Sequence, residues 1–433
     1  MTTAARTYPE QITIVPVTSP VDAEVLLPGS KSYTNRALIL AALANGRSTI
    51  NAALFSDDTH HMADSLRRLG IPMHEDAEAK RFVVDGTCGR IPATTAQLFV
   101  GNSGTTARFI TALLALGHGE YVVDGVERMR QRPIAPLLDA LQQLNVDAIA
   151  INGDGCPPLR VTTAGLEGGS ARLAGDTSSQ YFSALLMVGG VPKDGLRIEV
   201  EGDLVSKPYI DMTAATMRAF GVEMRNENYQ RFTVPGGQTY HAIDYHVEPD
   251  ASAASYFFAL AAATGGRVRV RNLGVNSGQG DSHFVDVLEQ MGCTIVREEN
   301  ALEVHGPKRL RGIDIDMNAI SDTMQTLAAI APLADGPVTI RNVAHIRHKE
   351  TDRIRAAVTE LRRLGVEVSE REDGLTIQPA MIKPATIETY DDHRMAMSFA
   401  ILGCAVPGIT IRDPGCVAKT FPGFFDVLAS TVR

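Results

Sequence analysis

The feature that most constrains the fold of this chain is a pattern that recurs six times along its 433 residues. Each copy begins with hydroxyl-rich residues, continues into an Ala/Leu-rich helical segment and a glycine, and ends in a short β-branched strand, as in KSYTNRALILAALANGRSTI. We predict that these helices end at glycines spaced 71 to 75 residues apart, namely Gly46, Gly117, Gly190, Gly265, Gly336 and Gly408. Such a period indicates one supersecondary unit used repeatedly.

A second kind of segment lies between these copies. It is an amphipathic helix that runs into a turn and a strand, as in DSLRRLGIPM and ELRRLGVEV. The turn residues are of the types that favour a left-handed helix stop: Gly70, Asn145, Gly221, Gly292 and Gly365. Each repeat therefore has two helices and several strands. We predict an α/β chain of two domains with three repeats each and a break near residues 245–250, with one continuous solenoid as the alternative.

Composition excludes several classes of function. The net charge is −9, so we expect no general attraction to nucleic acid or to anionic membranes. The apolar run at residues 257–263 is too short to span a bilayer, and we expect no signal peptide. The five cysteines are scattered and unpaired in spacing, which favours a reducing compartment over a disulfide framework or a zinc cluster.

Cations gather at the predicted helix starts. Lys31, Arg36, Arg108 and Arg394 lie within about a turn of the first kind of helix. A cation there opposes the helix dipole unless an anion lies between the two, so such starts indicate sites for phosphate or carboxylate groups. More cations precede other helices: Arg128, Arg130, Arg132, Lys349, Arg353, Arg355 and Lys419. The alternative is that the hydroxyl residues only cap helices and the charges are solvated.

Common nucleotide, metal and hydrolase motifs do not fit. In LPGSKSYTNR, Ser30 separates Gly29 from Lys31, so the phosphate-binding loop motif fails, and GNSGTT lacks the dinucleotide spacing. The His60-His61 pair and the segment DDHR have no metal-ligand spacing, and no GxSxG motif is present. The sequence therefore predicts a site for small anions without a metal.

Eight segments, taken together and in order, resemble one enzyme family. LPGSKSYTNR, GNSGTTAR, RQRPI, SSQ, LVSKPYID, RHKETDR, YDDHRMAM and AKTFPG are similar to segments of the EPSP synthase (3-phosphoshikimate 1-carboxyvinyltransferase) family, over nearly the whole chain. The resemblance implies two inverted α/β domains, an inside-out α/β barrel of βαβαββ-type repeats with the cleft between them. It places domain I at 1–29 and 249–433, and domain II at 30–248.

The resemblance also implies an activity. Such enzymes transfer the enolpyruvyl group of phosphoenolpyruvate to the 5-hydroxyl of shikimate 3-phosphate by addition and elimination. We therefore expect a cytoplasmic, monomeric transferase of chorismate and aromatic amino-acid biosynthesis, which uses no cofactor and is a target of glyphosate. Its partners would be the two small-molecule substrates alone, without nucleic acid or membrane.

Residue roles carry over position by position. The resemblance implies catalytic roles for Asp322, Glu350 and Lys31. It implies phosphoenolpyruvate binding by Lys31, Asn102, Gly104, Arg132, Gln180, Arg353, Arg394 and Lys419. It implies shikimate 3-phosphate binding by Ser32, Arg36, Ser178, Ser179, Gln180, Ser206, Tyr209, Asp322, His345 and Lys349.

Some of these residues have a simpler interpretation, and two depart from the common pattern. Asp322 could be an ordinary N-cap in ISDTMQT, and Glu350 a first-turn acid that complements a helix dipole. His345 stands where many members have asparagine, and Phe109 where many have proline; we expect the latter to weaken inhibition by glyphosate. Two alternatives remain. One is a UDP-N-acetylglucosamine enolpyruvyl transferase, which would carry Asn after Lys31 and a cysteine near RQRPI; the other is a non-catalytic repeat protein that binds anions.

Overall fold

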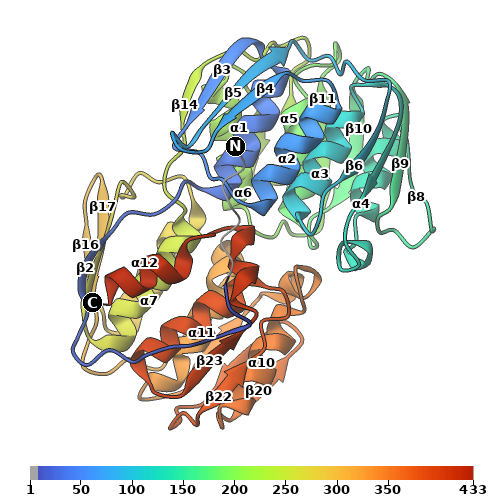
Figure 1. The fold of residues 1–433 in the computed structure, drawn as a ribbon. Helices are drawn as coiled ribbons and strands as arrows, with labels where there is room; N and C mark the ends of the chain where they lie inside the picture. The colour runs from blue at the N-terminus through green and yellow to red at the C-terminus, as the bar shows by residue number, and fades with distance from the viewer. Residues whose placement is uncertain (1–7, 433) are drawn as a thin grey trace. The chain divides into compact units, whose positions relative to one another are not determined.

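The computed structural model describes residues 8–432, and the chain divides into two compact units. Unit 1 combines Met1–Pro28 with Glu248–Arg433, and unit 2 is Gly29–Val247. The ends of the predicted domain I, residues 1–7 and 433, lie outside the described residues. Unit 1 is therefore discontinuous: its N-terminal strand β2 (Asp22–Val25) pairs with β15 (Arg267–Arg271), more than two hundred residues later (Figure 1).

Unit 2 contains three four-stranded sheets with one shared topology. In each sheet a parallel pair of strands continues into two antiparallel neighbours. In spatial order the sheets are β14 (Asp244–His246), β3 (Asn45–Asn51), β5 (Arg81–Thr87), β4 (Met73–Asp76); β6 (Thr95–Phe99), β7 (His118–Asp124), β9 (Leu159–Ala164), β8 (Asp147–Ala150); and β10 (Gly169–Ala174), β11 (Leu196–Glu201), β13 (Arg231–Val234), β12 (Arg225–Glu227).

Unit 1 repeats the same topology three times, with one strand fewer in its last sheet. Its sheets are β2, β15, β17 (Ala301–His305), β16 (Thr294–Arg297); β18 (Asp314–Asp316), β19 (Val338–Arg341), β21 (Gly374–Ile377), β20 (Val368–Arg371); and β22 (Ala385–Ile387), β23 (Ile409–Arg412), β1 (Gln11–Thr13). The prediction of an α/β fold with three βαβαββ-type repeats in each of two parts is confirmed.

Each repeat has one buried and one amphipathic helix. The buried helices are enclosed on most of their circumference, although their first turns carry polar and charged side chains; they are α1 (Lys31–Leu43), α3 (Gly104–Leu114), α5 (Ser179–Val188), α7 (Ala251–Thr264), α9 (Met324–Ile330) and α11 (His393–Ala405). The others keep one polar face: α2 (Asp57–Arg68), α4 (Ala135–Gln143), α6 (Pro208–Ala219), α8 (Phe284–Gln290), α10 (Arg353–Arg363) and α12 (Phe424–Thr431).

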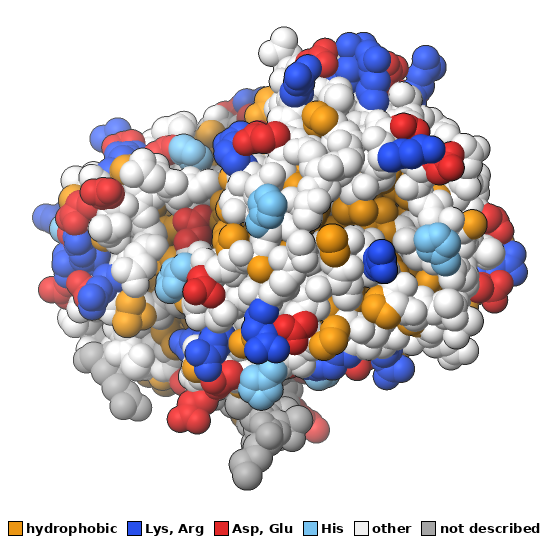
Figure 2. All heavy atoms as spheres, turned by 90° about the horizontal axis from the view of Figure 1, so that it is seen from above, with side chains coloured by type: hydrophobic (Ala, Val, Ile, Leu, Met, Phe, Trp, Pro, Cys, Tyr) orange, Lys and Arg blue, Asp and Glu red, His pale blue; other side chains and the backbone are white. Residues whose placement is uncertain are grey.

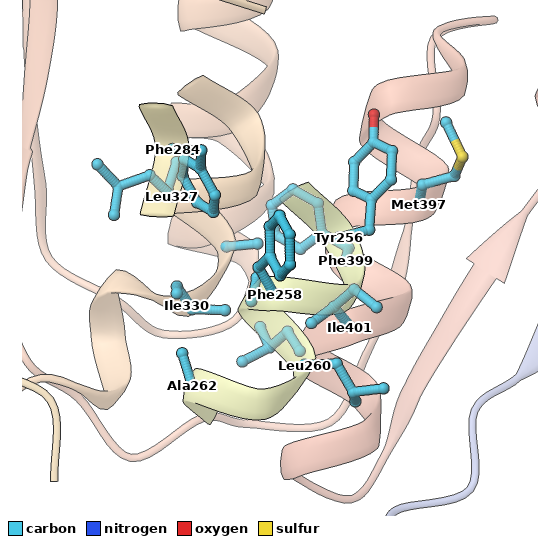
Figure 3. Packing of buried hydrophobic residues seen from close by; sticks show 14 of the residues in the cluster. Tyr256, Phe258, Leu260, Ala262, Phe284, Leu327, Ile330, Met397, Phe399 and Ile401 are labelled. Atoms are coloured by element: carbon cyan, nitrogen blue, oxygen red, sulfur yellow. The ribbon is translucent and has the colours of Figure 1, made fainter. Parts of the chain in front are cut away.

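Each unit has its own hydrophobic core. In unit 1, helices α7, α9 and α11 pack on one another, and Figure 3 shows Phe258, Leu327 and Phe399 among the side chains that fill the space around α7. Because these three helices are fixed against each other by packing, their N-terminal ends are held in fixed relative positions.

The two kinds of predicted helix stop had different outcomes. All five second-kind stops are confirmed: Gly70, Asn145, Gly221, Gly292 and Gly365 have φ of 85°, 63°, 86°, 98° and 82°. The first-kind prediction was wrong for most repeats, since only Gly265 (φ 65°) is a left-handed cap, on α7. Helix α1 ends at Leu43 on an extended cap residue, and Gly46 lies inside β3. The helix therefore does not end on a left-handed residue, and the positive φ of Gly46 (111°) lies within the strand.

The structure also describes the charges on the surface and the lengths of the helices. On the face drawn in Figure 2, basic and acidic side chains are mixed. None of the helices in residues 8–432 is long and apolar enough to cross a membrane. Within the same residues, no group of three or more His, Cys, Asp or Glu side chains is arranged to hold a metal ion.

Candidate functional site

The start of α1 places a lysine and an arginine one turn apart in unit 2. The Ser30 hydroxyl caps the helix by accepting from the Tyr33 amide, which leaves Lys31 at the first helical position. The Lys31 Nζ lies 3.4 Å from Oδ2 of Asp58, a buried carboxylate in the first turn of α2. Lys31 is therefore held at a helix N-terminus with one carboxylate beside it.

Arg36 is a buried cation that only neutral groups surround. Its side chain donates from Nε to the Thr213 hydroxyl (2.8 Å), from Nη1 to the Ser32 carbonyl (3.1 Å), and from Nη2 to the Tyr209 carbonyl (3.0 Å). The guanidinium also lies 5.3 Å from the centre of the Phe109 ring. Burial lowers the pKa of Arg36 to about 10. Among the described residues no carboxylate pairs with it, so the position favours an anionic ligand.

The start of α3 brings two more guanidinium groups together around a glycine. Arg132 donates from Nη1 to the carbonyl and the side-chain oxygen of Asn102, at 2.9 and 3.1 Å. Arg108 lies over the Tyr181 ring at 5.4 Å, and its Nε has no hydrogen-bond partner within the described chain. A Cβ at Gly104 would lie 2.4 Å from both Arg108 Nη1 and Arg132 Nη2. The absence of a side chain at Gly104 therefore lets both arginines approach the helix start.

The starts of α5 and α6 contribute hydroxyl groups. Ser178 caps α5 by accepting from the Gln180 amide at 3.3 Å, and Ser179 is the buried first residue of that helix. Ser206, two residues before α6, has φ 55° and is buried. Helix α6 contacts α1 through Tyr209, whose carbonyl accepts a hydrogen bond from Arg36.

In unit 1, three cations converge on Asp322. Its Oδ1 accepts from Lys349 Nζ (2.5 Å) and from Arg353 Nη1 (3.0 Å), and its Oδ2 accepts from Arg394 Nη2 (2.8 Å). Asp322 lies in a 3₁₀ turn (Asn318–Thr323), and Thr323 is the residue that precedes α9. The N-cap interpretation of Asp322 was therefore wrong, because its carboxylate serves as an ion-pair centre.

Arg353, the first residue of α10, joins three carboxylates. It donates from Nε to Asp392 Oδ2 (2.8 Å) and from Nη2 to Glu350 Oε2 (2.6 Å), in addition to its bond with Asp322. Although burial opposes its charge, Asp392, Glu350 and Asp322 raise the pKa of Arg353 above its ordinary value. Lys419 Nζ lies 3.9 Å from Glu350 Oε1. Since Asp352 is the N-cap of α10, Glu350 lies outside the helix and its primary partner is Arg353, not the helix dipole.

Two polar residues complete the surroundings of Asp322. His345 Nε2 lies 2.9 Å from the Ser321 hydroxyl. Burial lowers the pKa of His345 to about 3, and the charge of Lys349 adds to this effect while Asp322 opposes it. Burial also lowers the pKa of Lys349, against the attraction of Asp322. The imidazole is therefore neutral at physiological pH.

A second carboxyl group lies behind this cluster. Asp281 accepts a short hydrogen bond from the Ser252 hydroxyl, at the start of α7. Burial raises the pKa of Asp281 to about 6, and the charge of Asp322 adds to the rise while Arg394 opposes it. Burial also lowers the pKa of His393 well below its ordinary value. Several titratable groups with shifted pKa values thus lie near the starts of α7, α9 and α11.

The structure gathers the predicted residues into two groups, one in each unit. Unit 1 brings together Asp322, His345, Lys349, Glu350, Arg353, Arg394 and Lys419. Unit 2 has the others at its helix starts: Lys31, Ser32, Arg36, Asn102, Gly104, Arg132, Ser178, Ser179, Gln180, Ser206 and Tyr209. We call these the unit 1 half-site and the unit 2 half-site.

Other cations that the sequence singled out do not join the half-sites through the contacts observed. Arg130 pairs with Asp124 at 2.7 Å on an exposed surface. Arg355, 68% exposed, pairs with Glu370 at 3.0 Å. For these residues the interpretation as solvated surface charges is the correct one.

Sequence reasoning missed two carboxylates. Asp392 caps α11 by accepting from the Arg394 amide at 2.9 Å, and it holds Arg353 as well. Asp58 holds Lys31. A signal for Asp392 was present, since an aspartate directly before a predicted helix start is a probable N-cap. Asp58 had no such signal, because its role depends on how α2 packs beside α1.

Comparison with known proteins identifies relatives along the whole chain. The sequence profile of EPSP synthase (3-phosphoshikimate 1-carboxyvinyltransferase) matches residues 15–428. A 3-phosphoshikimate 1-carboxyvinyltransferase from Nostoc punctiforme is 55% identical, covering 96% of this chain and 98% of the relative. A chloroplastic enzyme of the same name from Nicotiana tabacum is 45% identical over 97% of this chain and 84% of its own length.

Solved structures show the same fold. EPSP synthase from Acinetobacter baumannii has a TM-score of 0.82 at 25% identity and covers 97% of this chain and 98% of its own. The enolpyruvyl transferase NikO from Streptomyces tendae has a TM-score of 0.76 at 18% identity, covering 98% and 97%, and supports the fold alone.

Proposed function

Because the chain belongs to the EPSP synthase (3-phosphoshikimate 1-carboxyvinyltransferase) family, it is a transferase, and we propose roles for its two half-sites in that reaction. The enzyme transfers the enolpyruvyl group of phosphoenolpyruvate to the 5-hydroxyl of shikimate 3-phosphate, a step of the shikimate pathway to aromatic amino acids. The hydroxyl oxygen adds to C2 and a proton adds to C3. The resulting tetrahedral intermediate then loses that proton and its phosphate.

In this proposal the unit 1 half-site performs the proton transfers at the 5-hydroxyl and at C3. Asp322 accepts the proton of the 5-hydroxyl, and Glu350 delivers a proton to C3 and removes it again during elimination. The observation that carries this assignment is the convergence of Lys349, Arg353 and Arg394 on Asp322. Three cations stabilise the ionised carboxylate that a general base requires.

The same cations also connect substrate binding to the basicity of Asp322. Three nearby positive charges make a carboxylate a weak base. Arg353 and Arg394 are the residues that we assign to phosphoenolpyruvate, whose phosphate and carboxylate groups compete for the same guanidinium donors. Withdrawal of these donors by the substrate strengthens Asp322 as a base when both substrates are in place. Lys349 and His345 are assigned to shikimate 3-phosphate beside it.

The unit 2 half-site is assigned to binding the anionic groups. Arg36, with Ser32, Ser178, Ser179, Ser206 and Tyr209, holds shikimate 3-phosphate, and Gln180 contacts both substrates. Arg132, Asn102 and the backbone at Gly104 bind phosphoenolpyruvate, with Lys419 and the two arginines of unit 1. Lys31 contacts phosphoenolpyruvate and protonates the departing phosphate. Support comes from the helix N-termini and from cations such as Arg36 that no carboxylate neutralises among the described residues.

An assay of phosphate release tests the activity and its alternative together. Phosphoenolpyruvate is supplied with shikimate 3-phosphate in one reaction and with UDP-N-acetylglucosamine in another. We expect release only with shikimate 3-phosphate. Release with UDP-N-acetylglucosamine alone would establish the other transferase, and release with neither would support a binding protein.

Substitutions test the roles of individual residues. Glu350→Gln keeps the acceptor for Arg353 but removes the proton-transferring group, so kcat falls while both KM values change little. Lys31→Ala removes a cation that we assign to both binding and leaving-group protonation, so kcat falls and KM for phosphoenolpyruvate rises. An unchanged KM for phosphoenolpyruvate in Lys31→Ala would exclude direct contact.

We further propose that the enzyme works in the cytoplasm as a monomer, and that it has no cofactor, as the family resemblance implies. Light scattering coupled to size-exclusion chromatography tests the oligomeric state, with 46.5 kDa expected for one chain. A mass near twice this value at micromolar concentration would contradict the monomer.

A further inference from the structure

A buried glutamate on α10 holds the segment that leads into α11. Glu360 is fully buried, and its carboxylate accepts from four donors. Arg363 donates from Nε at 2.9 Å and from Nη2 at 3.3 Å, the Glu388 amide donates at 3.2 Å, and the Tyr390 hydroxyl donates at 2.6 Å. A carboxylate so enclosed fixes the positions of the groups around it.

The held segment has a conformation that its side chains disfavour. Tyr390 and Asp391 have φ of 55° and 53°, so two consecutive residues with side chains are left-handed. Such residues persist only where surrounding contacts hold them. The contacts that hold it include the two hydrogen bonds to Glu360 from Glu388 and Tyr390, the bond from the Asp392 amide to the Thr389 carbonyl at 2.9 Å, and the ion pair of Glu388 with Arg412 at 2.9 Å.

This turn leads into Arg394, a residue of the unit 1 half-site, and into Asp392, which holds Arg353 of the same half-site. Asp392 follows Asp391 directly, caps α11 and accepts from Arg353 Nε at 2.8 Å. Arg394 comes two residues later and donates to Asp322. Glu360 and Arg353 both belong to α10, so this helix contacts the α11 entry at two places: Arg353 at its first residue and Glu360 two turns later.

We propose that Glu360 and Tyr390 are positioning residues, which hold the left-handed turn at 388–392 so that Arg394 and the Arg353–Asp392 pair are aligned for phosphoenolpyruvate. Neither residue touches the reacting groups in this proposal. They act through the backbone between the Glu360 carboxylate and the start of α11. The inference rests on the proposed assignment of Arg353 and Arg394 to phosphoenolpyruvate.

Tyr390→Phe is the sharpest test, because it removes one hydroxyl from a ring that is 39% exposed and leaves packing unchanged. We expect KM for phosphoenolpyruvate to rise about three- to tenfold, the range that corresponds to one lost hydrogen bond, with KM for shikimate 3-phosphate unchanged. The matched control is Tyr121→Phe, which removes a hydroxyl bonded to the Ala93 carbonyl in the sheet of unit 2. It should leave both KM values unchanged.

A double-mutant cycle shows whether the two residues act through one contact. Glu360→Met, which keeps the side-chain length and removes both acceptor oxygens, should raise KM for phosphoenolpyruvate as well, and the double variant with Tyr390→Phe should be no worse than Glu360→Met alone. Full additivity would overturn the coupling. If Glu360→Met does not fold, the comparison of Tyr390→Phe with Tyr121→Phe still decides.

Two outcomes would overturn the proposal, and neither can be confused with failure of the proposed function. One is a Tyr390→Phe enzyme with a lower melting temperature and wild-type KM values, which would mean a purely structural role. The other is an equal rise of both KM values, which would mean a general disturbance. If the wild-type protein releases no phosphate from the two substrates, the proposed function itself fails, whatever the variants do.

Discussion

The two half-sites are built on the same repeat, but Arg353 in unit 1 and Arg36 in unit 2 have opposite kinds of partner. In unit 1, carboxylates of the protein surround the cations: Arg353 alone contacts Asp322, Glu350 and Asp392. In unit 2, Arg36 contacts two hydroxyls, two carbonyls and an aromatic ring. Arg108 rests on the Tyr181 ring, and neither arginine has a carboxylate partner among the described residues.

This difference shows how the same repeat can serve anion binding in one unit and proton transfer in the other. A buried cation without a carboxylate keeps its attraction for a ligand anion, so the unit 2 arrangement favours tight binding of phosphate groups. In a cluster of cations and carboxylates the charges already neutralise one another. A change in the hydrogen bonds within the cluster then shifts the pKa of its carboxylates, which suits proton transfer. The predictions below test this contrast in order of expected effect.

The largest effect is expected from Asp322→Asn, which removes the charge at the centre of the unit 1 half-site. The amide is almost the same size but cannot take the proton of the 5-hydroxyl, so kcat should fall about 10²- to 10⁴-fold with smaller changes in KM. Steady-state phosphate release measures both parameters.

The matched control for this variant is Asp314→Asn, an exposed partner of Arg341 in the same unit, which should leave kcat unchanged. If Asp322→Asn mainly raises KM, the residue binds substrate instead of moving a proton, and the contrast between the half-sites loses its catalytic meaning.

The next largest effect is a difference in unfolding free energy between substitutions at Arg353 and at Arg36. Arg353→Gln leaves Asp392, Glu350 and Asp322 without a shared cation, so unfolding free energy should fall by about 3–5 kcal/mol. Arg36→Gln removes a buried charge that has no carboxylate, and stability should be unchanged or higher, while KM for shikimate 3-phosphate should rise about tenfold or more. Urea unfolding and steady-state kinetics on both variants provide the measurements. Equal destabilisation by the two substitutions would break the comparison.

The sequence was sufficient for the repeat and for the helix starts, but not for this contrast. The period of the pattern and the left-handed stops at residues such as Asn145 and Gly365 are local, and the structure confirms them. The cations at the helix starts were also visible. Which cation meets a carboxylate depends on packing between helices that are distant in sequence: Arg36 reaches Thr213, and Arg353 reaches Asp392. The spacing of residues along the chain does not predict which of these distant residues come into contact.

Two individual positions also could not be predicted from the local sequence alone. Asp322 reads as a helix cap in ISDTMQT, yet a 3₁₀ turn before α9 directs its carboxylate to Lys349 and Arg394. Gly46 reads as a helix stop, yet α1 passes into β3 on an extended residue. Both errors have one physical cause, which is that tertiary contacts override a local preference when a helix end is buried.

A smaller effect is expected for His345→Asn, which probes the titratable surroundings of unit 1. The folded-state pKa of His345 is about 3, below its ordinary value of 6.5, so the unfolded chain binds the proton more readily between these values. Stability from this group is therefore full above pH 6.5 and is lost as the pH falls. Relative to wild type, His345→Asn should gain about 2 kcal/mol of unfolding free energy between pH 7.5 and pH 5.

Urea unfolding at the two pH values checks this difference. His393 and Asp281 also titrate abnormally, but they are common to both proteins and cancel in the comparison. A pH-independent difference would mean that His345 is protonated in the folded state, contrary to a neutral imidazole between Ser321 and Lys349.

The smallest effect is expected from Gly104→Ala, which adds a methyl group to the unit 2 half-site. The new Cβ would lie 2.4 Å from the guanidinium nitrogens of Arg108 and Arg132, so both must shift. Because alanine suits a helix, folding should not suffer, whereas KM for phosphoenolpyruvate should rise about tenfold as the displaced cations lose their alignment. Gly189→Ala is the control, since the atoms nearest its added methyl are apolar carbons of Leu196 and Val234 at 3.2 Å. An equal rise of KM in both variants would show that the space at Gly104 does not set the positions of Arg108 and Arg132.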